Sequence, residues 1–212
     1  MTEHTPQFPN YVLFLPPEGL ELGDRPPREW KPREARKHFD WFVSAIPERL
    51  DQLNGAAQDI AERLDYSPES LKVLGQWFCS VVTSRKKTAK EIERELAGMS
   101  ERARKLGMGI NQDWTLTGET FSIAMDVGIY LGEVFRKQFP ALKWYLCTRP
   151  KRDISYNQPV LEGGKMKIDP IHLVVTMAWG VARRRRDAGS LFELYNIWVS
   201  YTDLENASEV AR

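Results

Sequence analysis

Apolar residues recur at spacings of three and four along most of the chain, which is the period of an amphipathic helix. The clearest example covers 117–138, and Pro140 ends it. Thr88 and Ser190 each precede a glutamate by three residues, so both predict capping boxes. Pro47 falls inside the first pattern and predicts a kink or a new helix start. Helices are expected to begin near Pro32, Ser67-Pro68, Thr88, Thr117, Asp169-Pro170 and Ser190.

Short runs of aromatic and β-branched residues predict a small sheet between two of these helices. Strands are expected at 142–148, 158–162 and 166–168, with a turn at Gly163-Gly164. Strands do not alternate with helices through the chain, which disfavours a doubly wound α/β fold. We therefore expect an α+β fold, a helix-rich single domain with a small antiparallel sheet packed by helices.

The N-terminal stretch has a different pattern from the rest of the chain. Residues 11–15 are a short apolar run, which predicts a strand or an extended arm against the body. Five prolines lie between positions 16 and 32 and predict a loop. The expected organisation is an arm and loop over 1–32 and one domain over 33–212, divided into a helical subregion (33–106) and a helix-sheet-helix core (107–212).

Charge and composition remove several classes of function. Lys and Arg total 30 and Asp and Glu total 29, giving a formal net charge of +1, so nucleic-acid binding is not expected. No apolar run approaches the roughly 18 residues of a membrane span, and no leader is visible, so we expect a cytoplasmic protein. Cys79 and Cys147 lie in apolar settings and predict buried free thiols, with a disulfide as the alternative.

Motifs that carry chemistry are missing from the sequence. It contains no phosphate-binding glycine loop, no dinucleotide fingerprint, no zinc-protease helix and no nucleophile elbow. His4, His38 and His172 have no ligand partners at metal spacing, and His172 is expected to be structural. We therefore expect no cofactor, no metal and no catalytic residue, and an enzyme is disfavoured.

One helix nevertheless holds a set of candidate residues. Glu119, Asp126, Tyr130 and Glu133 are spaced by seven, four and three, which places them on one stripe of the helix. Two carboxylates about two turns apart can share a divalent metal or divide acid and base roles. The alternatives are partner binding, a solvated stripe, or pairing with arginines such as Arg136.

Further candidates lie outside this stripe. Trp144 and Tyr145 are on opposite faces of a predicted strand. The amides of Asn157 and Gln158 can bind a ligand or hold the turn before the next strand. Arg184 and Arg185 belong to a run of four arginines at a helix end. Such a run favours the helix dipole and can also dock an acidic protein face or phosphate.

Gly128 and Gly132 lie four residues apart on the same helix as the stripe. Each costs about 1 kcal/mol of helix stability relative to alanine. We expect this cost to be offset by a tight packing seam, formed against the strand pair or the last helix, with the close approach of a ligand as the alternative.

Several segments carry a resemblance to known proteins. The stretch Phe121 to Phe135, then Leu142-Lys143-Trp144 and Asn157 to Leu161, resembles a group of uncharacterised bacterial cytosolic proteins. Phe39 to Phe42 and Leu194 to Trp198 extend the resemblance over roughly 35–200. The helix-then-tryptophan pattern is also similar to immunity proteins of bacterial toxin systems. This implies a helix packed on a strand, and a toxin as partner, but transfers no catalytic residue.

Three hypotheses of function follow. The first is a protein-binding module, an immunity-like inhibitor of a bacterial toxin, whose aromatic residues supply interface anchors. The second is a small-molecule-binding protein or enzyme that uses the Asp126 and Glu133 stripe. The third is a self-associating protein, such as a homodimer, with the charged helix from Thr88 to Leu106 as its interface and Gly107 as its stop.

Overall fold

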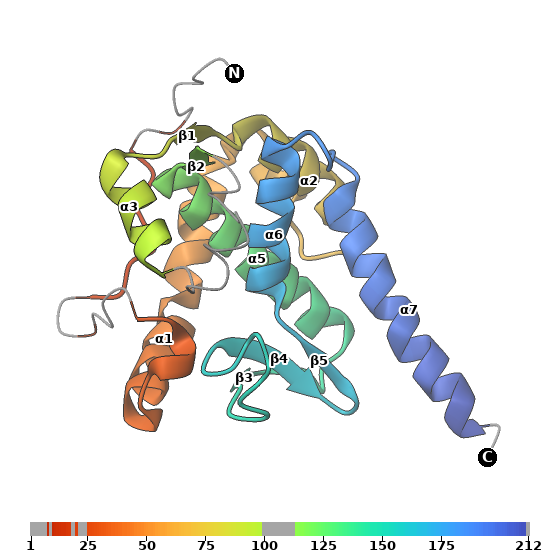
Figure 1. The fold of residues 1–212 in the computed structure, drawn as a ribbon. Helices are drawn as coiled ribbons and strands as arrows, with labels where there is room; N and C mark the ends of the chain where they lie inside the picture. The colour runs from red at the N-terminus through yellow and green to blue at the C-terminus, as the bar shows by residue number, and fades with distance from the viewer. Residues whose placement is uncertain (1–7, 9, 18–19, 21–24, 99–112, 211–212) are drawn as a thin grey trace.

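The computed structural model describes residues 8, 10–17, 20, 25–98 and 113–210, with side chains up to residue 201. Helix α5 (Gly118–Gln138) lies at the centre and packs against α1 (Pro32–Ala56), α2 (Ser70–Val81) and α6 (Pro170–Ala182) (Figure 1). Thr117 begins α5 by accepting the N–H of Thr120. Most of α5 is buried, so it organises the hydrophobic core. This confirms the predicted central helix.

The first helix continues past its internal proline. Pro47 lies within α1 and does not start a new helix. The helix begins at Pro32, where Glu34 accepts the N–H of Lys31 at 2.7 Å. Two short 3-10 helices flank it, η1 (Pro27–Glu29) before it and η2 (Gln58–Arg63) after it.

A three-stranded antiparallel sheet lies below α5 and α6 in Figure 1. Its strands are β3 (Lys143–Leu146), β4 (Pro159–Gly163) and β5 (Met166–Ile168), with β4 in the middle. Leu161 is paired with Trp144 on one side and with Ile168 on the other. The predicted small antiparallel sheet and the helix-rich α+β class are both confirmed.

A second sheet was not predicted. It pairs β1 (Ser84–Lys86) with β2 (Trp114–Leu116), antiparallel, near the top of Figure 1. Strand β1 contains only serine, arginine and lysine, so it lacks the β-branched and aromatic residues that indicate a strand. Between them, α3 (Ala89–Gly98) begins at the predicted capping box, with the Thr88 N–H donating to Glu91 at 2.8 Å. The predicted stop at Gly107 lies outside the described residues.

Helix α7 (Ser190–Val210) runs along α2 and α6 and then projects away from the body (Figure 1). The predicted capping box at Ser190 is wrong. Ser190 is already helical, and the Glu193 N–H donates to the Gly189 carbonyl at 3.0 Å. Asp187 takes the capping role instead, because its carboxylate accepts the Gly189 N–H and the Ser190 hydroxyl.

The two central glycines form a packing seam, as predicted. A Cβ on Gly128 would lie 2.8 Å from the Cα of Ile171, so α6 touches α5 there. A Cβ on Gly132 would lie 2.6 Å from the ring of Trp144, which comes from β3. The seam therefore involves the sheet and α6, not the last helix.

The N-terminal arm is extended, and residues 11–15 form no strand. Tyr11 and Phe14 are buried in the body, whereas Val12 and Leu15 point outward. The Phe14 N–H donates to the Ser122 hydroxyl of α5 at 3.0 Å. Of the two predicted alternatives, the extended arm is the one observed.

Candidate functional site

Asp126 lies at the centre of a buried cluster that joins the arm, α1 and α5. Its side chain is fully buried, and Arg49 donates to its two oxygens at 2.8 Å and 2.6 Å. The Tyr11 hydroxyl donates to the same carboxylate at 2.5 Å. Arg49 also donates to the carbonyl of Val12, so the cluster clasps the arm. Asp126 is thus paired with an arginine, but this arginine is Arg49 of α1 and not Arg136.

Burial and hydrogen bonding act against each other at this cluster. Burial raises the pKa of Asp126, and the bonds from Arg49 and Tyr11 only partly offset this. Burial lowers the pKa of Arg49, but the bonds to Asp126 outweigh it, so the net pKa is raised. The raised pKa of Asp126 favours the neutral carboxyl and so disfavours the charged pair. The raised pKa of Arg49 favours the charged guanidinium and so favours the pair. The pair is charged, because three short hydrogen bonds donated to one carboxylate hold it ionised.

The rest of the predicted stripe has separate partners. Tyr130 is buried and bonds Ser70 at 2.8 Å, while the Tyr66 N–H donates to its oxygen at 2.9 Å. Glu133 accepts the indole N–H of Trp144 at 2.9 Å and also pairs with Arg136. The structure therefore brings Glu133 and Trp144 together but does not gather the stripe around one cavity. Among the described residues, no group of three or more His, Cys, Asp or Glu is placed to hold a metal ion.

The two predicted amides have different positions. Asn157 is buried, has a φ of 63° and donates to the carbonyls of Pro27 and Trp30 at 2.8 Å and 3.2 Å. Those bonds hold the segment before α1 against the loop between β3 and β4. Gln158 lies beside a pocket described below.

Arg184 and Arg185 are exposed beyond the end of α6. The Arg185 N–H donates to the carbonyl of Gly180 and the Arg184 N–H to that of Val181, both at 2.8 Å. This is a Schellman motif, and Arg184 occupies its left-handed position with a φ of 56°. Glycine usually takes that position, so an arginine there is held in a strained conformation that presents it to solvent.

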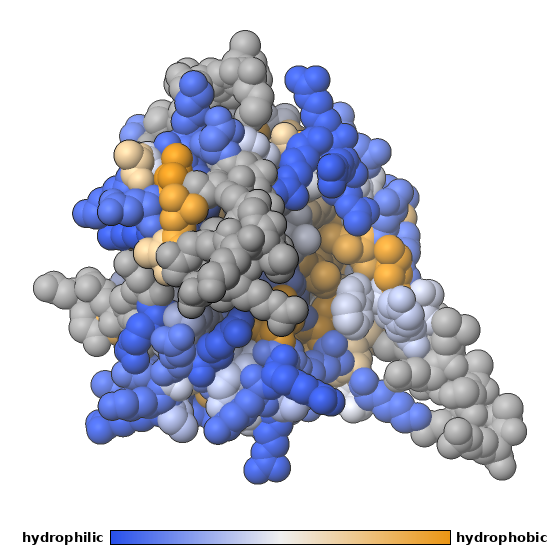
Figure 2. Space-filling model, in the orientation of Figure 1, coloured by the Kyte–Doolittle hydropathy of each residue, from blue (hydrophilic) through white to orange (hydrophobic). Residues whose placement is uncertain are grey.

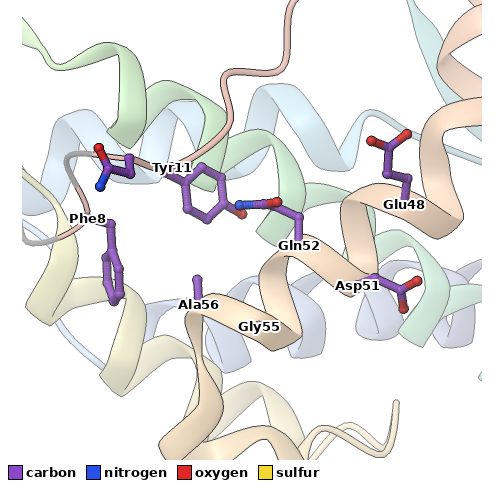
Figure 3. A pocket seen from close by; sticks show the side chains of 8 residues that line it. Phe8, Tyr11, Glu48, Asp51, Gln52, Gly55 and Ala56 are labelled. Atoms are coloured by element: carbon purple, nitrogen blue, oxygen red, sulfur yellow. The ribbon is translucent and has the colours of Figure 1, made fainter.

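Three hollows in the surface of the described residues are candidate sites for a ligand. One of about 580 Å³ lies between the arm and α1, where Figure 3 shows Tyr11 and Gln52 in the middle and Glu48 and Asp51 directed away from them. One of about 660 Å³ lies between α1, α5 and β3, beside Glu133 and Trp144. The charged residues that line these two hollows are either exposed, as Glu48, Asp51 and Lys143 are, or paired, as Glu133 is with Arg136.

The third hollow is smaller and brings polar groups together in an apolar setting. Its volume is about 300 Å³, and it lies where η1, α1, α5, β4 and α6 meet. We call it the His38–Asp169 pocket. Its polar lining is His38, Gln158, Asp169 and His172, and its apolar lining is Pro27, Phe42, Met125, Ile154, Pro159, Ile171 and Val175. An apolar pocket with a few polar groups is the usual form of a small-molecule site.

His38 is the unusual member of this pocket. Its Nδ1 is the one buried side-chain nitrogen or oxygen in the described part of the chain that has no hydrogen-bond partner. The ring lies between Trp30 and Trp41, with centroid distances of 4.9 Å and 5.3 Å. Burial lowers the pKa of His38 to about 4, so the imidazole is neutral at pH 7.

Asp169 contributes a carboxylate at the beginning of α6. It accepts the His172 N–H at 2.9 Å as the N-cap of the helix, and Ser155 bonds its side chain. Burial raises its pKa, while these bonds act in the opposite direction. Nearby Pro170 and Ile171 rest on Gly128, so the glycine seam positions this carboxylate.

Sequence reasoning missed this pocket, although it had named Gln158. His38 and Asp169 are far apart in the chain, and each has an ordinary local role, on a charged helix and as an N-cap. The one local signal is the placement of Trp30 and Trp41 around His38, which predicts an enclosed ring.

Comparison of the chain with protein-family models found no match, and comparisons with curated proteins and with solved structures found none either. The resemblance to immunity-like families therefore stays an expectation. No helix within the described ranges is long and apolar enough to cross a membrane.

Proposed function

We propose that the protein binds a small molecule in the His38–Asp169 pocket, one with an apolar body and a hydrogen-bond donor. The observation that carries this proposal is the buried Nδ1 of His38, which has no partner. Leaving such an atom unsatisfied costs about 1–3 kcal/mol, and a ligand recovers that cost once the ring of His38, which lines the pocket, turns this nitrogen toward it. A small-molecule-binding protein was the second hypothesis from the sequence, but there the site was the stripe of Asp126 and Glu133.

The chemistry of the lining indicates what the ligand offers. A neutral imidazole has one donor and one acceptor nitrogen, and Asp169 and Gln158 add acceptor oxygens. The matching ligand groups are a hydroxyl, an amide N–H or an ammonium. The apolar lining from Phe42, Met125 and Ile171 matches an aromatic or branched aliphatic body.

We expect donor-bearing probes to bind this pocket and donor-free probes of similar shape to bind about tenfold more weakly. A single hydrogen bond of about 1.4 kcal/mol accounts for this ratio. Benzamide, benzyl alcohol and benzylamine are titrated into ¹⁵N-labelled protein, with ethylbenzene as the donor-free probe. Binding is read from the shifts of amide signals around residues 154–159 and 169–175. Protonation of His38 does not change the affinity between pH 7 and pH 5, because the pKa of His38 lies near 4. A loss of affinity in that range reports on Asp169, whose pKa is raised by burial.

Three variants separate this site from the rest of the surface. His38→Leu removes the acceptor, and Asp169→Asn removes the charge while keeping a good N-cap residue. Glu48→Gln changes the hollow of Figure 3 and leaves this pocket intact. Binding that is equal for donor-bearing and donor-free probes, or that survives His38→Leu unchanged, contradicts the proposal.

A second proposal keeps the first hypothesis from the sequence, binding of a protein partner with an acidic face. It is supported by the arginines from Arg183 to Arg186, all exposed, and by the strained backbone that presents Arg184. On α7, Ile197 and Tyr201 are also exposed, and Figure 2 shows a hydrophobic area beside this helix. An immunity-like inhibitor of a toxin belongs to this class of function.

We expect the double variant Arg184→Glu and Arg185→Glu to lose a partner that the native protein retains from its host lysate. The partner is identified by mass spectrometry and the complex is rebuilt from purified components. Lys151→Glu with Arg152→Glu is the matched control, since both residues are exposed and basic but lie in another loop. A rebuilt complex that tolerates the double variant contradicts this proposal. Light scattering that shows a dimer of the chain alone favours self-association.

A further inference from the structure

Cys147 and Lys167 lie close enough for a covalent bond to form between their side chains. The Lys167 Nζ is 2.9 Å from the Cys147 Sγ, a distance typical of contacts to the smaller oxygen atom. Cys147 follows β3 and Lys167 lies in β5, on either side of β4. The sequence separates them by 20 residues, so only the sheet brings them together.

Both side chains are held in place. The Asp153 carboxylate accepts from Lys167 at 2.5 Å, and the Arg149 carbonyl lies 3.5 Å from the same nitrogen. The backbone of Cys147 is fixed by its N–H to the carbonyl of Gln158 and by the N–H of Asn157 to its carbonyl. Cys147 is 1% exposed, whereas the side chain of Lys167 is 31% exposed, so the lysine is the solvent-facing member of the pair.

We propose that Cys147 and Lys167 form an S–N crosslink, a sulfenamide, when hydrogen peroxide oxidises the thiol. In the first step the sulfur attacks one peroxide oxygen, an S–O bond forms and the O–O bond breaks. The released hydroxide takes the thiol proton and leaves as water. The sulfur loses two electrons to the peroxide and becomes a sulfenic acid.

In the second step the partly exposed Lys167 ammonium loses a proton to solvent, which frees the nitrogen lone pair. The nitrogen attacks the sulfur, the S–N bond forms and the S–O bond breaks. The departing hydroxyl takes a proton from the nitrogen and leaves as water. One thiol, one amine and one peroxide thus yield one sulfenamide and two waters.

The contacts of Lys167 hold its nitrogen beside the sulfur. Burial lowers the pKa of Lys167, but the bonds to Asp153 and Cys147 outweigh it, so the pKa of the amine is raised. The second step therefore uses the small deprotonated fraction of the amine, which the sheet keeps in contact with the sulfur.

Mass spectrometry of the peroxide-treated native protein tests this inference. Tryptic cleavage is expected to give peptides 144–151 and 166–183 joined, with a combined mass two hydrogen atoms below their sum. Cleavage after Lys167 is blocked in that product, and dithiothreitol separates the two peptides again. Unlinked peptides, with Cys147 either unchanged or carrying only added oxygen, overturn the proposal. Linked peptides that retain one oxygen overturn the direct S–N assignment.

Controls isolate the contribution of the folded geometry. Lys167→Arg keeps a positive charge beside Asp153 but removes the amine, so no link is expected. Protein treated with peroxide in guanidinium is also expected to stay unlinked, because unfolding separates the pair. Cys79, the other free cysteine, is the internal comparison and is expected to acquire oxygen without a link. Equal crosslinking in folded and unfolded protein counts against the inference, and this comparison needs no variant to fold.

Discussion

Asp126→Asn is expected to lower the free energy of unfolding by about 3–5 kcal/mol, because it leaves the guanidinium of Arg49 buried without its charge partner. The side chain of Arg49 is only 6% exposed and that of Asp126 is 0% exposed, so water cannot replace the lost interaction. The substitution also weakens the bond from Tyr11, which holds the N-terminal arm. Urea unfolding followed by circular dichroism measures the change.

A second carboxylate of the predicted stripe, that of Glu133, provides the matched control. Glu133 is on the same helix but has a partly exposed side chain, and its partner Arg136 is 40% exposed. Solvent screens this pair, so Glu133→Gln is expected to cost less than about 1 kcal/mol. Similar losses for the two variants would show that burial of the Asp126 pair has been misjudged.

A double-mutant cycle gives a sharper reading of the same cluster. Arg49→Met alone leaves the Asp126 carboxylate buried and is expected to be as harmful as Asp126→Asn. The combined variant removes both charges, so its loss is expected to be smaller than the sum of the two single losses. Strict additivity would mean that the two residues do not act as a pair.

Gly128→Ala is expected to lower the free energy of unfolding by about 1–3 kcal/mol, through overpacking of α5 against α6. The new Cβ would lie 2.8 Å from the Cα of Ile171 and 3.0 Å from the carbonyl oxygen of Pro170. Backbone atoms at these positions cannot turn aside as a flexible side chain does, so the two helices must separate. Thermal and urea unfolding measure the loss.

A glycine in open surroundings provides the opposite expectation. Gly55 lies in α1, and a Cβ added there would meet no atom within 4 Å, so Gly55→Ala is expected to stabilise the protein by about 0.5–1 kcal/mol.

Gly128→Ala should also disturb probe binding in the His38–Asp169 pocket, because Ile171 lines that pocket and Asp169 precedes the same turn of α6. If both alanine variants stabilise the protein, the seam is not tight.

Local patterns were sufficient for most of the helices and for the three-stranded sheet. The apolar period predicted α5 within a residue of its bounds, since a long helix repeats its signal over several turns. The capping box at Thr88 was equally local and is present. At Ser190 the same motif misled, because Ser190 already lies inside the helix and its hydroxyl donates to the Asp187 carboxylate. The short β1 and β2 strands had no repeat from which to predict them.

The candidate residues show the limit of this reasoning. Asp126 and Glu133 both lie on α5 as predicted. Each has its own partner from another element, Arg49 of α1 for Asp126 and Trp144 of β3 for Glu133. The prediction that these residues bind a ligand or partner stays a prediction, as do the roles of Arg184 and Arg185. His38 was set aside in the sequence because nothing near it in the chain marks it as chemical.

By itself, the sequence determined the helix-rich α+β class, the central helix, the glycine seam and the free cysteines, because these depend on short-range periodicity and composition. Only the tertiary structure decided that Arg49 is the partner of Asp126, 77 residues away, and that His38 and Asp169 share a pocket. It alone brought Cys147 beside Lys167. Side chains from distant segments meet only after the core packs, and no local pattern in the chain encodes which of them become neighbours.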